Sequence, residues 1–383
     1  MASFVFTGDI GFDKHMTGRF ADPELLSPEI LDFFHSADHV VANVEGALTN
    51  AKDVHGKGFL FHAMDPKAAS FLDSIHADVW SIANNHSMDA GIEGLQDTMA
   101  LAKAHGAKTI GAGMNEVEAA KPVIFPEDGG VGIFACGYLP SCIPADAENG
   151  GNFCWDDFDR IAQTAKEIKK TCRYCILIVH GGEEFCAVPI DYIRERYHKY
   201  LDLGVDIVVA HHPHVVENYE LLENGKAIFY SLGNFIFDTD YQRAQPDTDA
   251  GVLLRLDLKE DGFTFEPLPM QLIRGEERLV KADKLSPIFT NIGEKEYWDV
   301  LPLSCRAFLA CEKRRRIFQR PNEYVDMTEE KWAKEFCMLR KGMKPGAHLD
   351  CTHHMKYAAM EGNADTMPAV KEYLEKELAF HNK

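Results

Sequence analysis

The sequence lacks the run of about 20 uninterrupted apolar residues that a membrane-spanning helix needs, and it is poor in cationic residues. Lys and Arg total 40 against 60 Asp and Glu, which gives a net charge of -20. This charge opposes binding to nucleic acid and to anionic membranes. An anionic substrate, whether a small molecule or a polymer, therefore needs a local cationic site, and bound metal is one way to make it.

Signals for secretion and for a cysteine zinc site are also scarce. The N-terminus has no basic region followed by an apolar stretch, so we expect a cytoplasmic protein with no secretion signal and no transmembrane segment. Only Cys172 and Cys175 form a close pair among the ten cysteines. With no second pair to complete a zinc knuckle, reduced structural thiols are the favoured interpretation. The sequence does not indicate an oligomeric state.

Apolar residues make up 46% and charged residues 26% of the 383 residues, which is typical of a globular protein and excludes collagenous and disordered classes. The composition becomes charged and helical near residue 276. Length and composition together predict one large domain at residues 1–275, followed by a mainly helical C-terminal extension at 276–383.

Short apolar runs alternate with amphipathic segments along the large domain, which predicts a layered α/β fold. Strands are expected at residues 4–6, 39–42, 79–83, 131–136, 175–179, 207–210 and 227–231. Apolar residues spaced by three and four predict helices at 66–74, 92–105, 156–170 and 190–203. A hairpin is expected from 252–258 and 263–267, and helices in the extension at 302–318 and 365–380.

Two features of the extension are interpreted without a functional role. The basic run at residues 313–316 is expected to form a solvated helix face, balanced by nearby acids, rather than an anion contact. His353 and His354 are expected to face solvent rather than to act as further metal ligands.

Histidine, acidic and amide side chains repeatedly follow the end of an expected strand. The six clusters are residues 7–9, 42–46, 83–91, 180–184, 210–214 and 231–235. At this edge of an α/β sheet, loops from several strands converge and ligands bind. Each cluster alone would be a turn, a cap or a structural histidine. The six together favour one shared site.

The histidine cluster points to a metal. His211, His212 and His214 lie within four residues, and imidazole nitrogens that converge from one loop suit a divalent transition metal. The other candidate ligands are Asp9, Glu45, Asn85 and His180. Nitrogen and oxygen ligands without cysteine favour manganese, iron or zinc in a hydrolytic site over a thiolate zinc site.

These motifs, in this order, resemble the CapA-type family, also called the poly-γ-glutamate capsule biosynthesis family, within the calcineurin-like metallophosphatase superfamily. The matching motifs are Gly8-Asp9, Asn43-x-Glu45, residues 83–86 with Asp89 and Gly91, and residues 180–183, 211–214 and 231–235. The resemblance covers residues 3–270 and does not reach the C-terminal third. It implies a four-layer α/β/β/α metallophosphatase sandwich with a centre for two divalent metal ions.

The resemblance also implies a role for each matching residue. Asp9 and His214 correspond to ligands of the first metal, and Glu45 corresponds to the bridging ligand, although it is longer than the usual aspartate. The second metal is implied to bind Asn85, His180 and His212.

Two positions depart from the family pattern. Gly11 replaces the histidine of an Asp-x-His motif, so the first metal lacks one ligand unless His211, His15 or water supplies it. One tightly held metal with a labile second metal is therefore an alternative. Gly181 replaces the tryptophan that usually follows the His180 position, and we expect it to leave more room or flexibility beside the site.

His86 and Asp89 are the candidate catalytic residues. The resemblance places His86 outside the ligand set, where a cationic imidazole could protonate the leaving oxygen or stabilise developing charge. Asp89 either orients His86 or caps the backbone amides of the helix that begins near residue 92.

Four further residues are candidates for contact with the substrate: Glu183, Glu184, Asn234 and His211. The two glutamates either contact the substrate, accept a hydrogen bond from a ligating histidine, or form a solvated loop pair. Asn234 either presents its amide to the substrate or holds the histidine loop in place.

The favoured function is a metal-dependent hydrolase, a phosphoesterase in which metal ions activate a hydroxide for in-line displacement. One alternative is a non-catalytic accessory protein in poly-γ-glutamate or capsule biosynthesis, which the family association suggests. The missing N-terminal apolar segment and the net charge count against that role, because a membrane anchor would be expected and polyglutamate is itself anionic. Another alternative is a metal-dependent amide hydrolase, since the same hydroxide can attack a carbonyl.

Overall fold

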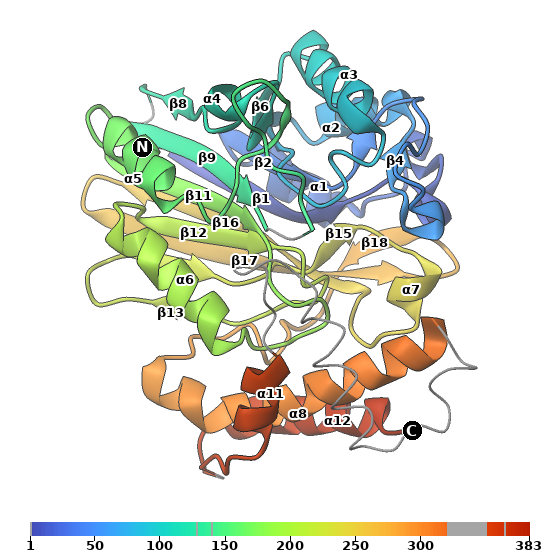
Figure 1. Cartoon of the computed structure of the whole chain (residues 1–383), viewed down its shortest axis with the longest axis vertical. Helices are drawn as coiled ribbons and strands as arrows, with labels where there is room; N and C mark the ends of the chain where they lie inside the picture. Colours follow the sequence, from blue (N-terminus) through green and yellow to red (C-terminus); the bar gives the residue numbers. More distant parts are fainter. Residues whose placement is uncertain (1, 128, 139–140, 320–350, 364) are drawn as a thin grey trace.

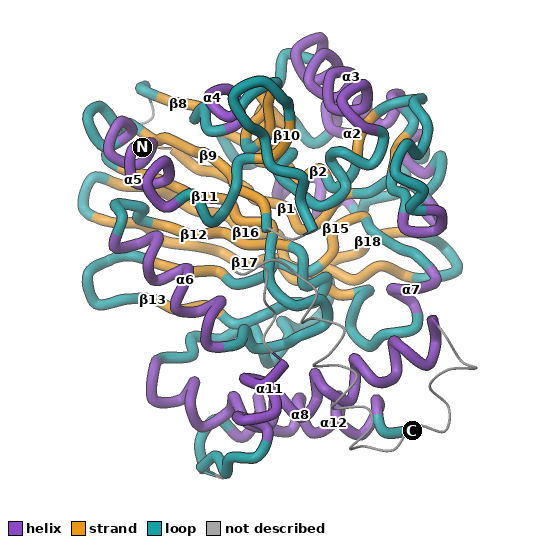
Figure 2. Tube along the Cα trace, in the orientation of Figure 1, coloured by secondary structure: helices purple, strands orange, loops and turns teal. Residues whose placement is uncertain are grey.

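The structure is a computed structural model that describes residues 2–127, 129–138, 141–319, 351–363 and 365–383. Two large β-sheets lie face to face at its centre (Figure 2). Within the described residues, the first sheet consists of β1 (Ala2–Ile10), β2 (His39–Val44), β5 (Ala77–Ser81), β6 (Lys108–Ile110), β15 (Asn234–Ile236), β16 (Ala250–Lys259), β17 (Gly262–Ile273) and β18 (Arg278–Lys281). The second consists of β8 (Val123–Phe125), β9 (Val131–Gly137), β11 (Tyr174–His180), β12 (Ile207–His211), β13 (Tyr219–Leu221) and β14 (Ala227–Phe229).

Helices cover the outer face of each sheet. The helices α1 (Pro28–His35), α2 (Ala69–Ser74) and α3 (Gly91–Ala104) share a buried cluster with the first sheet. The helices α5 (Phe158–Ile168) and α6 (Asp191–Asp202) share another with the second sheet. Shorter elements are α4 (Glu116–Ala119), α7 (Asp240–Arg243), and the pairs β3 (Ala47–Leu48) with β4 (Ala63–Met64) and β7 (Ala112–Gly113) with β10 (Gly151–Asn152).

Alternation along the strands explains the layers. In β1, Phe4 and Phe6 pack into the core between the sheets, whereas Val5 packs against the outer helices. In β11, Ile178 faces the inner core and Val179 faces α5 and α6. Successive side chains on a strand point to opposite faces, so both faces of each sheet are buried. The fold is therefore the expected four-layer α/β/β/α sandwich, and each fully buried Phe or Ile contributes about 1.5–3 kcal/mol to it.

Every strand expected from the sequence is present, and the expected hairpin is β16 with β17. The helix expected at 302–318 is instead α8 (Glu294–Gln319), which passes through Pro302. Proline favours the first turn of a helix because it has no amide proton to donate. The sequence pattern therefore placed the start of this helix too late.

The C-terminal helices α8, α11 (Cys351–Ala358) and α12 (Pro368–His381) lie together at the lower end of the molecule in Figure 1. Their residues Tyr297, Leu301 and Leu374 belong to the same buried cluster as the inter-sheet core. A helical C-terminal part is thus present. The domain boundary between residues 275 and 276 stays a prediction. Residues 320–350 of the expected extension lie outside the described residues. No helix of the described part of the chain is long and apolar enough to cross a membrane.

Two expectations for the extension are wrong. Arg315 is not on a solvated face: its side chain is 16% exposed and forms an ion pair with Glu184. His354 does not face solvent: it is 1% exposed, with Nε2 3.5 Å from Glu183 Oε1. Both side chains are covered because the C-terminal helices pack on the loop that follows β11. The side chains of Arg316 and His353 are outside the described ones.

Candidate metal centre

The carboxyl ends of the central strands bring the expected ligands to one edge of the two sheets. Asp9 lies near the end of β1 and Glu45 directly follows β2. From the second sheet, His180 and His211 are the last residues of β11 and β12 and pair across the ladder. The parallel register explains the convergence, since aligned strands end at the same edge.

The ligand atoms form two overlapping groups. Asp9, Glu45 and His214 form one group, and Glu45, His180 and His212 form the other, with the ligand atoms in each group within 4.8 Å of one another. Glu45 Oε1 lies 3.6 Å from His180 Nε2 and 3.8 Å from His214 Nε2. Asn85 joins the second group, with Oδ1 2.9 Å from His180 Nε2. The six expected ligands therefore meet, and Glu45 is common to both groups.

The burial of this cluster fits a bound cation. Asp9 and Glu45 are fully buried. Among the described residues, both carboxylate oxygens of Glu45 and one of Asp9 have no hydrogen-bond partner. The Nδ1 atoms of His180 and His212 also have none. A buried carboxylate without a partner costs several kcal/mol in an apolar interior. Divalent metal ions would satisfy the carboxylate oxygens, so the residues present fit the metal ions that the sequence resemblance implies.

The pKa values reflect crowding of like and opposite charges. Burial, together with the negative charge of Asp9, raises the pKa of Glu45 to about 8. Burial opposes the ionisation of Asp9, but the imidazole of His214, whose Nδ1 lies 3.2 Å from Asp9 Oδ2, outweighs burial and lowers the pKa of Asp9 to about 2. Burial lowers the pKa of His180 and of His212 to about 4. These two imidazoles are thus held neutral, the form that binds metal.

The loop that carries the histidines has an unusual backbone. His212 has φ 98° and His214 has φ 59°, in the left-handed region that residues other than glycine rarely adopt. Each such residue costs about 1–3 kcal/mol, and strain of this kind gathers at functional sites. The expected substrate contact Asn234 holds this loop: its Oδ1 lies 2.9 Å from His214 Nδ1, and its Nδ2 donates to the Thr248 carbonyl at 2.9 Å.

His86 and Asp89 lie together beside the ligands. His86 Nδ1 is 2.8 Å from Asp89 Oδ2, and His86 Nε2 is 3.9 Å from Glu45 Oε1. Asp89 orients His86 and does not cap α3, whose N-cap residue is Ala90. Burial, with nearby positive charge from Lys57 among others, lowers the pKa of His86 well below its usual range. His86 is therefore a neutral imidazole in this arrangement, not the cation considered from the sequence.

Sequence reasoning missed two side chains of this cluster. Lys57 donates to the Asn85 carbonyl at 3.0 Å and pairs with Asp89. The ring of His62 packs edge-on against His86 with centroids 4.3 Å apart, and its Nδ1 lies 2.7 Å from Asp13 Oδ2. Both residues come from a loop whose sequence carries no recognisable motif, so only the tertiary structure identifies them.

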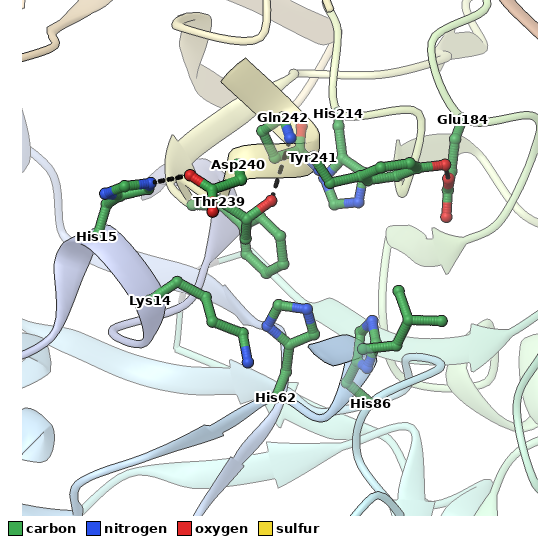
Figure 3. Close-up of a pocket in the computed structure, with 12 residues that line it drawn as sticks. Lys14, His15, His62, His86, Glu184, His214, Thr239, Asp240, Tyr241 and Gln242 are labelled. Atoms are coloured by element: carbon green, nitrogen blue, oxygen red, sulfur yellow. Dashed lines mark hydrogen bonds and ion pairs between the residues drawn. The ribbon is translucent and has the colours of Figure 1, made fainter. Parts of the chain in front are cut away.

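A cavity of about 370 Å³ opens onto the centre. Figure 3 shows His62 and His86 next to each other, across the cavity from Tyr241 and Gln242. The residues that line it are Lys14, His15, Leu60, His62, His86, Glu184, His214, Phe237, Thr239, Asp240, Tyr241 and Gln242. Of the four expected substrate contacts, only Glu184 is among them.

His211 and Glu183, like Asn234, are held by protein groups. His211 Nε2 donates to the Thr7 carbonyl at 2.8 Å, which ties the two sheets together. Glu183 is 2% exposed and accepts a hydrogen bond from the Tyr192 hydroxyl at 2.7 Å. Glu183 and Glu184 are therefore not a solvated loop pair.

Aromatic side chains pack against both residues that depart from the family pattern, Gly11 and Gly181. A Cβ on Gly11 would lie 2.7 Å from the Phe237 ring, so this ring occupies the space beside residue 11. A Cβ on Gly181 would lie 2.9 Å from Tyr138 Cβ and 3.0 Å from the Trp155 ring. The expectation of extra room beside Gly181 is wrong, because Tyr138 and Trp155 pack into it.

Comparison with known proteins places these observations in context. Residues 3–239 match the family described as "Bacterial capsule synthesis protein PGA_cap". The chain is 29% identical over 302 residues to the PGA biosynthesis protein CapA of Bacillus subtilis, covering 73% of this chain and 74% of that protein. It is 29% identical over 209 residues to the capsule biosynthesis protein CapA of Bacillus anthracis, covering 53% of this chain and 49% of that protein.

Two more distant similarities were found. A Mycobacterium tuberculosis protein described as a probable polyglutamine synthesis accessory protein is 25% identical over 221 residues, covering 53% of this chain and 56% of that protein. The solved structure of TT1561 of Thermus thermophilus superposes with a TM-score of 0.39 and 11% identity, covering 69% of this chain and 98% of that chain.

Proposed function

The chain belongs to the PGA_cap family of bacterial capsule synthesis proteins, and on that premise we propose that it is a metal-dependent hydrolase of phosphate esters. The observation that carries this proposal is the pair of ligand groups that share the buried Glu45. Because the two groups have a carboxylate in common, two bound divalent ions would be close enough to act on one phosphoryl group.

Asp9, Glu45 and His214 would hold one ion, and Glu45, His180 and His212 would hold the other with the help of Asn85. Manganese, iron and zinc match this mixture of imidazole and carboxylate ligands. When bound, divalent ions supply activation of water near neutral pH and neutralise the charge of the phosphoryl oxygens.

His86 acts on the leaving group. Asp89 accepts the hydrogen bond from His86 Nδ1, which fixes the tautomer and turns Nε2 toward Glu45. Since His86 lines the cavity, its unprotonated Nε2 can accept a proton from the attacking water and pass that proton to the departing oxygen of a substrate. Lys57, paired with Asp89, holds that carboxylate in place.

The cavity favours a small anionic ester or the end of an anionic polymer. The side chain of Lys14 lines it, beside those of Glu184 and Asp240, and supplies one positive charge at the cavity within a chain of net charge -20. Its volume of about 370 Å³ lies in the range of small-molecule sites. Leu60, Phe237 and Tyr241 supply apolar wall next to these groups.

Turnover on simple substrates tests this function. The purified chain, loaded in turn with Mn²⁺, Fe²⁺ or Zn²⁺, is assayed with p-nitrophenyl phosphate, bis(p-nitrophenyl) phosphate and γ-glutamyl-p-nitroanilide. We expect hydrolysis of one or both phosphate esters, lost in His180→Ala. Hydrolysis of the γ-glutamyl amide alone would instead establish the amide hydrolase.

An accessory role in capsule or polyglutamate biosynthesis is the second candidate. Its support is the description of the Mycobacterium tuberculosis relative as a probable accessory protein of polyglutamine synthesis. Metal binding without turnover on any of the three substrates, together with capture of a polymer synthase by the tagged chain, would favour this role.

A cytoplasmic location likewise stays a prediction, to be checked by fractionation of the native cells.

A further inference from the structure

The centre has a gap that the expected substitutes do not fill. Gly11 offers no ligand, and the Phe237 ring occupies the space beside it. His211 is committed to the Thr7 carbonyl, and His15 Nε2 pairs with Asp240 Oδ1 at 2.8 Å at the cavity wall. Among the described residues neither histidine belongs to a group of ligand atoms, although Nδ1 of His211 has no hydrogen-bond partner there.

Glu184 lies next to two of the expected ligands. Its carboxylate and the ring nitrogens of His212 and His214 form a third group of ligand atoms within 4.8 Å of one another. One oxygen, Oε2, accepts hydrogen bonds from Arg315 Nη2 at 2.6 Å and from the Tyr241 hydroxyl at 3.2 Å. Among the residues that the structure describes, Oε1 has no hydrogen-bond partner, so this oxygen is left for a ligand in the cavity that Glu184 lines.

Arg315 comes from α8, outside the residues that match the family. Its guanidinium lies 5.1 Å from the ring centres of both Phe185 and Tyr241 and also pairs with Glu312. The side chain is thus fixed by two rings and two carboxylates, a geometry that suits the planar, permanently charged guanidinium.

The contact between α8 and the centre is also apolar. Cys311, one turn before Arg315, packs in a buried cluster with Phe185 and Val215. Phe185 follows Glu184, and Val215 follows His214, so α8 touches the two loops that carry these side chains. Phe185 is itself tied to the histidine loop, because its amide donates to the Pro213 carbonyl at 2.7 Å.

We propose that Glu184 is an additional ligand of the metal centre, beside His212 and His214, and that Arg315 of α8 is the positioning residue that holds it. The inference rests on the metal centre of the proposed function. It makes the C-terminal helices part of the site, because metal affinity then depends on a side chain that the family-matched region does not contain.

Metal affinity tests this inference without reference to turnover. The full chain is stripped of metal, and its Mn²⁺ affinity is measured by competition with a fluorescent chelator. We expect Glu184→Gln and Arg315→Met to weaken Mn²⁺ binding about 10- to 100-fold. Arg315→Lys should recover part of the affinity, because it restores the charge but not the fork geometry.

Arg314 provides the matched control. It neighbours Arg315 on α8, but its guanidinium lies 4.0 Å from the Phe380 ring centre and its Nη1 donates to the Phe380 carbonyl at 3.2 Å. Arg314→Met should bind Mn²⁺ like the unchanged protein. Equal weakening by Arg314→Met and Arg315→Met would overturn the inference, because the effect would then come from α8 in general.

The conservative Glu184→Gln variant keeps the test decisive even if Arg315→Met fails to fold. Unchanged Mn²⁺ affinity in Glu184→Gln, with affinity lost in Asp9→Asn, would overturn the inference and leave the proposed function intact. If instead the expected affinity changes are found but no phosphate ester is hydrolysed, the proposed function fails and the inference stands.

Discussion

At the scale of single residues, the candidate metal centre is marked by buried polar atoms of Glu45 and its neighbours that have no hydrogen-bond partner among the described residues. Glu45 is fully buried with no hydrogen-bond partner among the described residues, which is costly in a folded protein unless a cation joins it. Nearby His212 and His214 adopt strained backbone conformations. Local departures of this kind from favourable structure are expected where function requires them.

His86→Ala separates a role in proton transfer from a role in metal binding. His86 is positioned by Asp89 and lines the cavity, but it belongs to none of the three ligand groups. We expect phosphoester turnover to fall about 10²- to 10⁴-fold with metal content unchanged. Asp89→Asn, which keeps the shape of the side chain, should give a smaller loss. Metal loss in His86→Ala with the fold intact would show that His86 is a ligand.

Gly11→Ala tests the packing that replaces the usual ligand. Because the added Cβ would lie 2.7 Å from the Phe237 ring, we expect the free energy of unfolding to fall by about 1–3 kcal/mol. In the Phe237→Ala background, Gly11→Ala should lower the free energy of unfolding by less, because the ring that the new Cβ would meet is absent. Urea denaturation of the two single variants and the double variant measures the coupling. An equal cost in both backgrounds would mean that Phe237 does not restrict residue 11.

Much of the site is predictable from the sequence, because its ligands follow strand ends in short motifs. His62, Lys57 and Arg315 are not, since each lies in a segment without a motif and reaches the centre only through tertiary packing. Arg315 was misjudged because a basic run on a helix usually faces solvent. The acid that it meets, Glu184, is far away in the sequence.

At the scale of elements, α12 shows how a helix from the C-terminal part meets the sandwich. Tyr373 and Glu377 of α12 line a groove with residues of β16 and β17 and with Asp247. Glu377 is 5% exposed and accepts a hydrogen bond from the Tyr373 hydroxyl at 3.2 Å. Burial, reinforced by Asp247, raises the pKa of Glu377 to about 8.

This raised pKa makes stability depend on pH. The carboxyl group is protonated in the folded protein up to about pH 8 but ionises near its usual pKa of 4.5 when unfolded. Its contribution to stability is therefore full below pH 4.5 and is lost as the pH rises through 8.

Glu377→Gln removes this titration. We expect it to raise the free energy of unfolding at pH 8.5 by roughly 1–3 kcal/mol and to change it little at pH 4.5, since the amide avoids burial of a charge. Urea denaturation at the two pH values is the measurement, with the exposed Glu375→Gln on the same helix as control. Equal effects of Glu377→Gln at both pH values would refute this account of the group.

The elements themselves follow closely from sequence periodicity, with the start of α8 as the clear exception. Strands such as β9 and β11 are buried on both faces and read as continuous apolar runs, which makes them easy to recognise. The start of α8 was missed because Pro302 looks like a helix start, whereas it lies inside the helix. Tertiary packing of Leu301 before Pro302 and of Cys305 after it stabilises the turns on either side.

At the scale of the whole molecule, the C-terminal helices and the sandwich share one core. Leu374 of α12 and Leu301 of α8 belong to the buried cluster that also contains Phe4 and Ile176 between the sheets. A continuous apolar core favours a single cooperative unfolding transition. The helix α8 also joins the C-terminal part to the candidate metal centre, because Cys311 packs against Phe185 and Arg315 pairs with Glu184.

Leu374→Ala tests this coupling. Leu374 is fully buried, so its truncation should lower the free energy of unfolding by about 2–5 kcal/mol. Far-ultraviolet circular dichroism and tryptophan fluorescence should report the same shifted transition. Leu221→Ala, at an exposed position of β13, serves as the control. A separate early transition for the C-terminal helices would contradict a shared core.

The central claim is that the strand ends hold divalent metal. The most direct test is metal content by mass spectrometry, on protein purified without a histidine tag or chelator, compared with the Asp9→Ala/His180→Ala double variant. We predict close to two equivalents of manganese, iron or zinc in the unchanged protein, lost in the folded double variant. No bound metal, even after incubation with these ions, would contradict the claim.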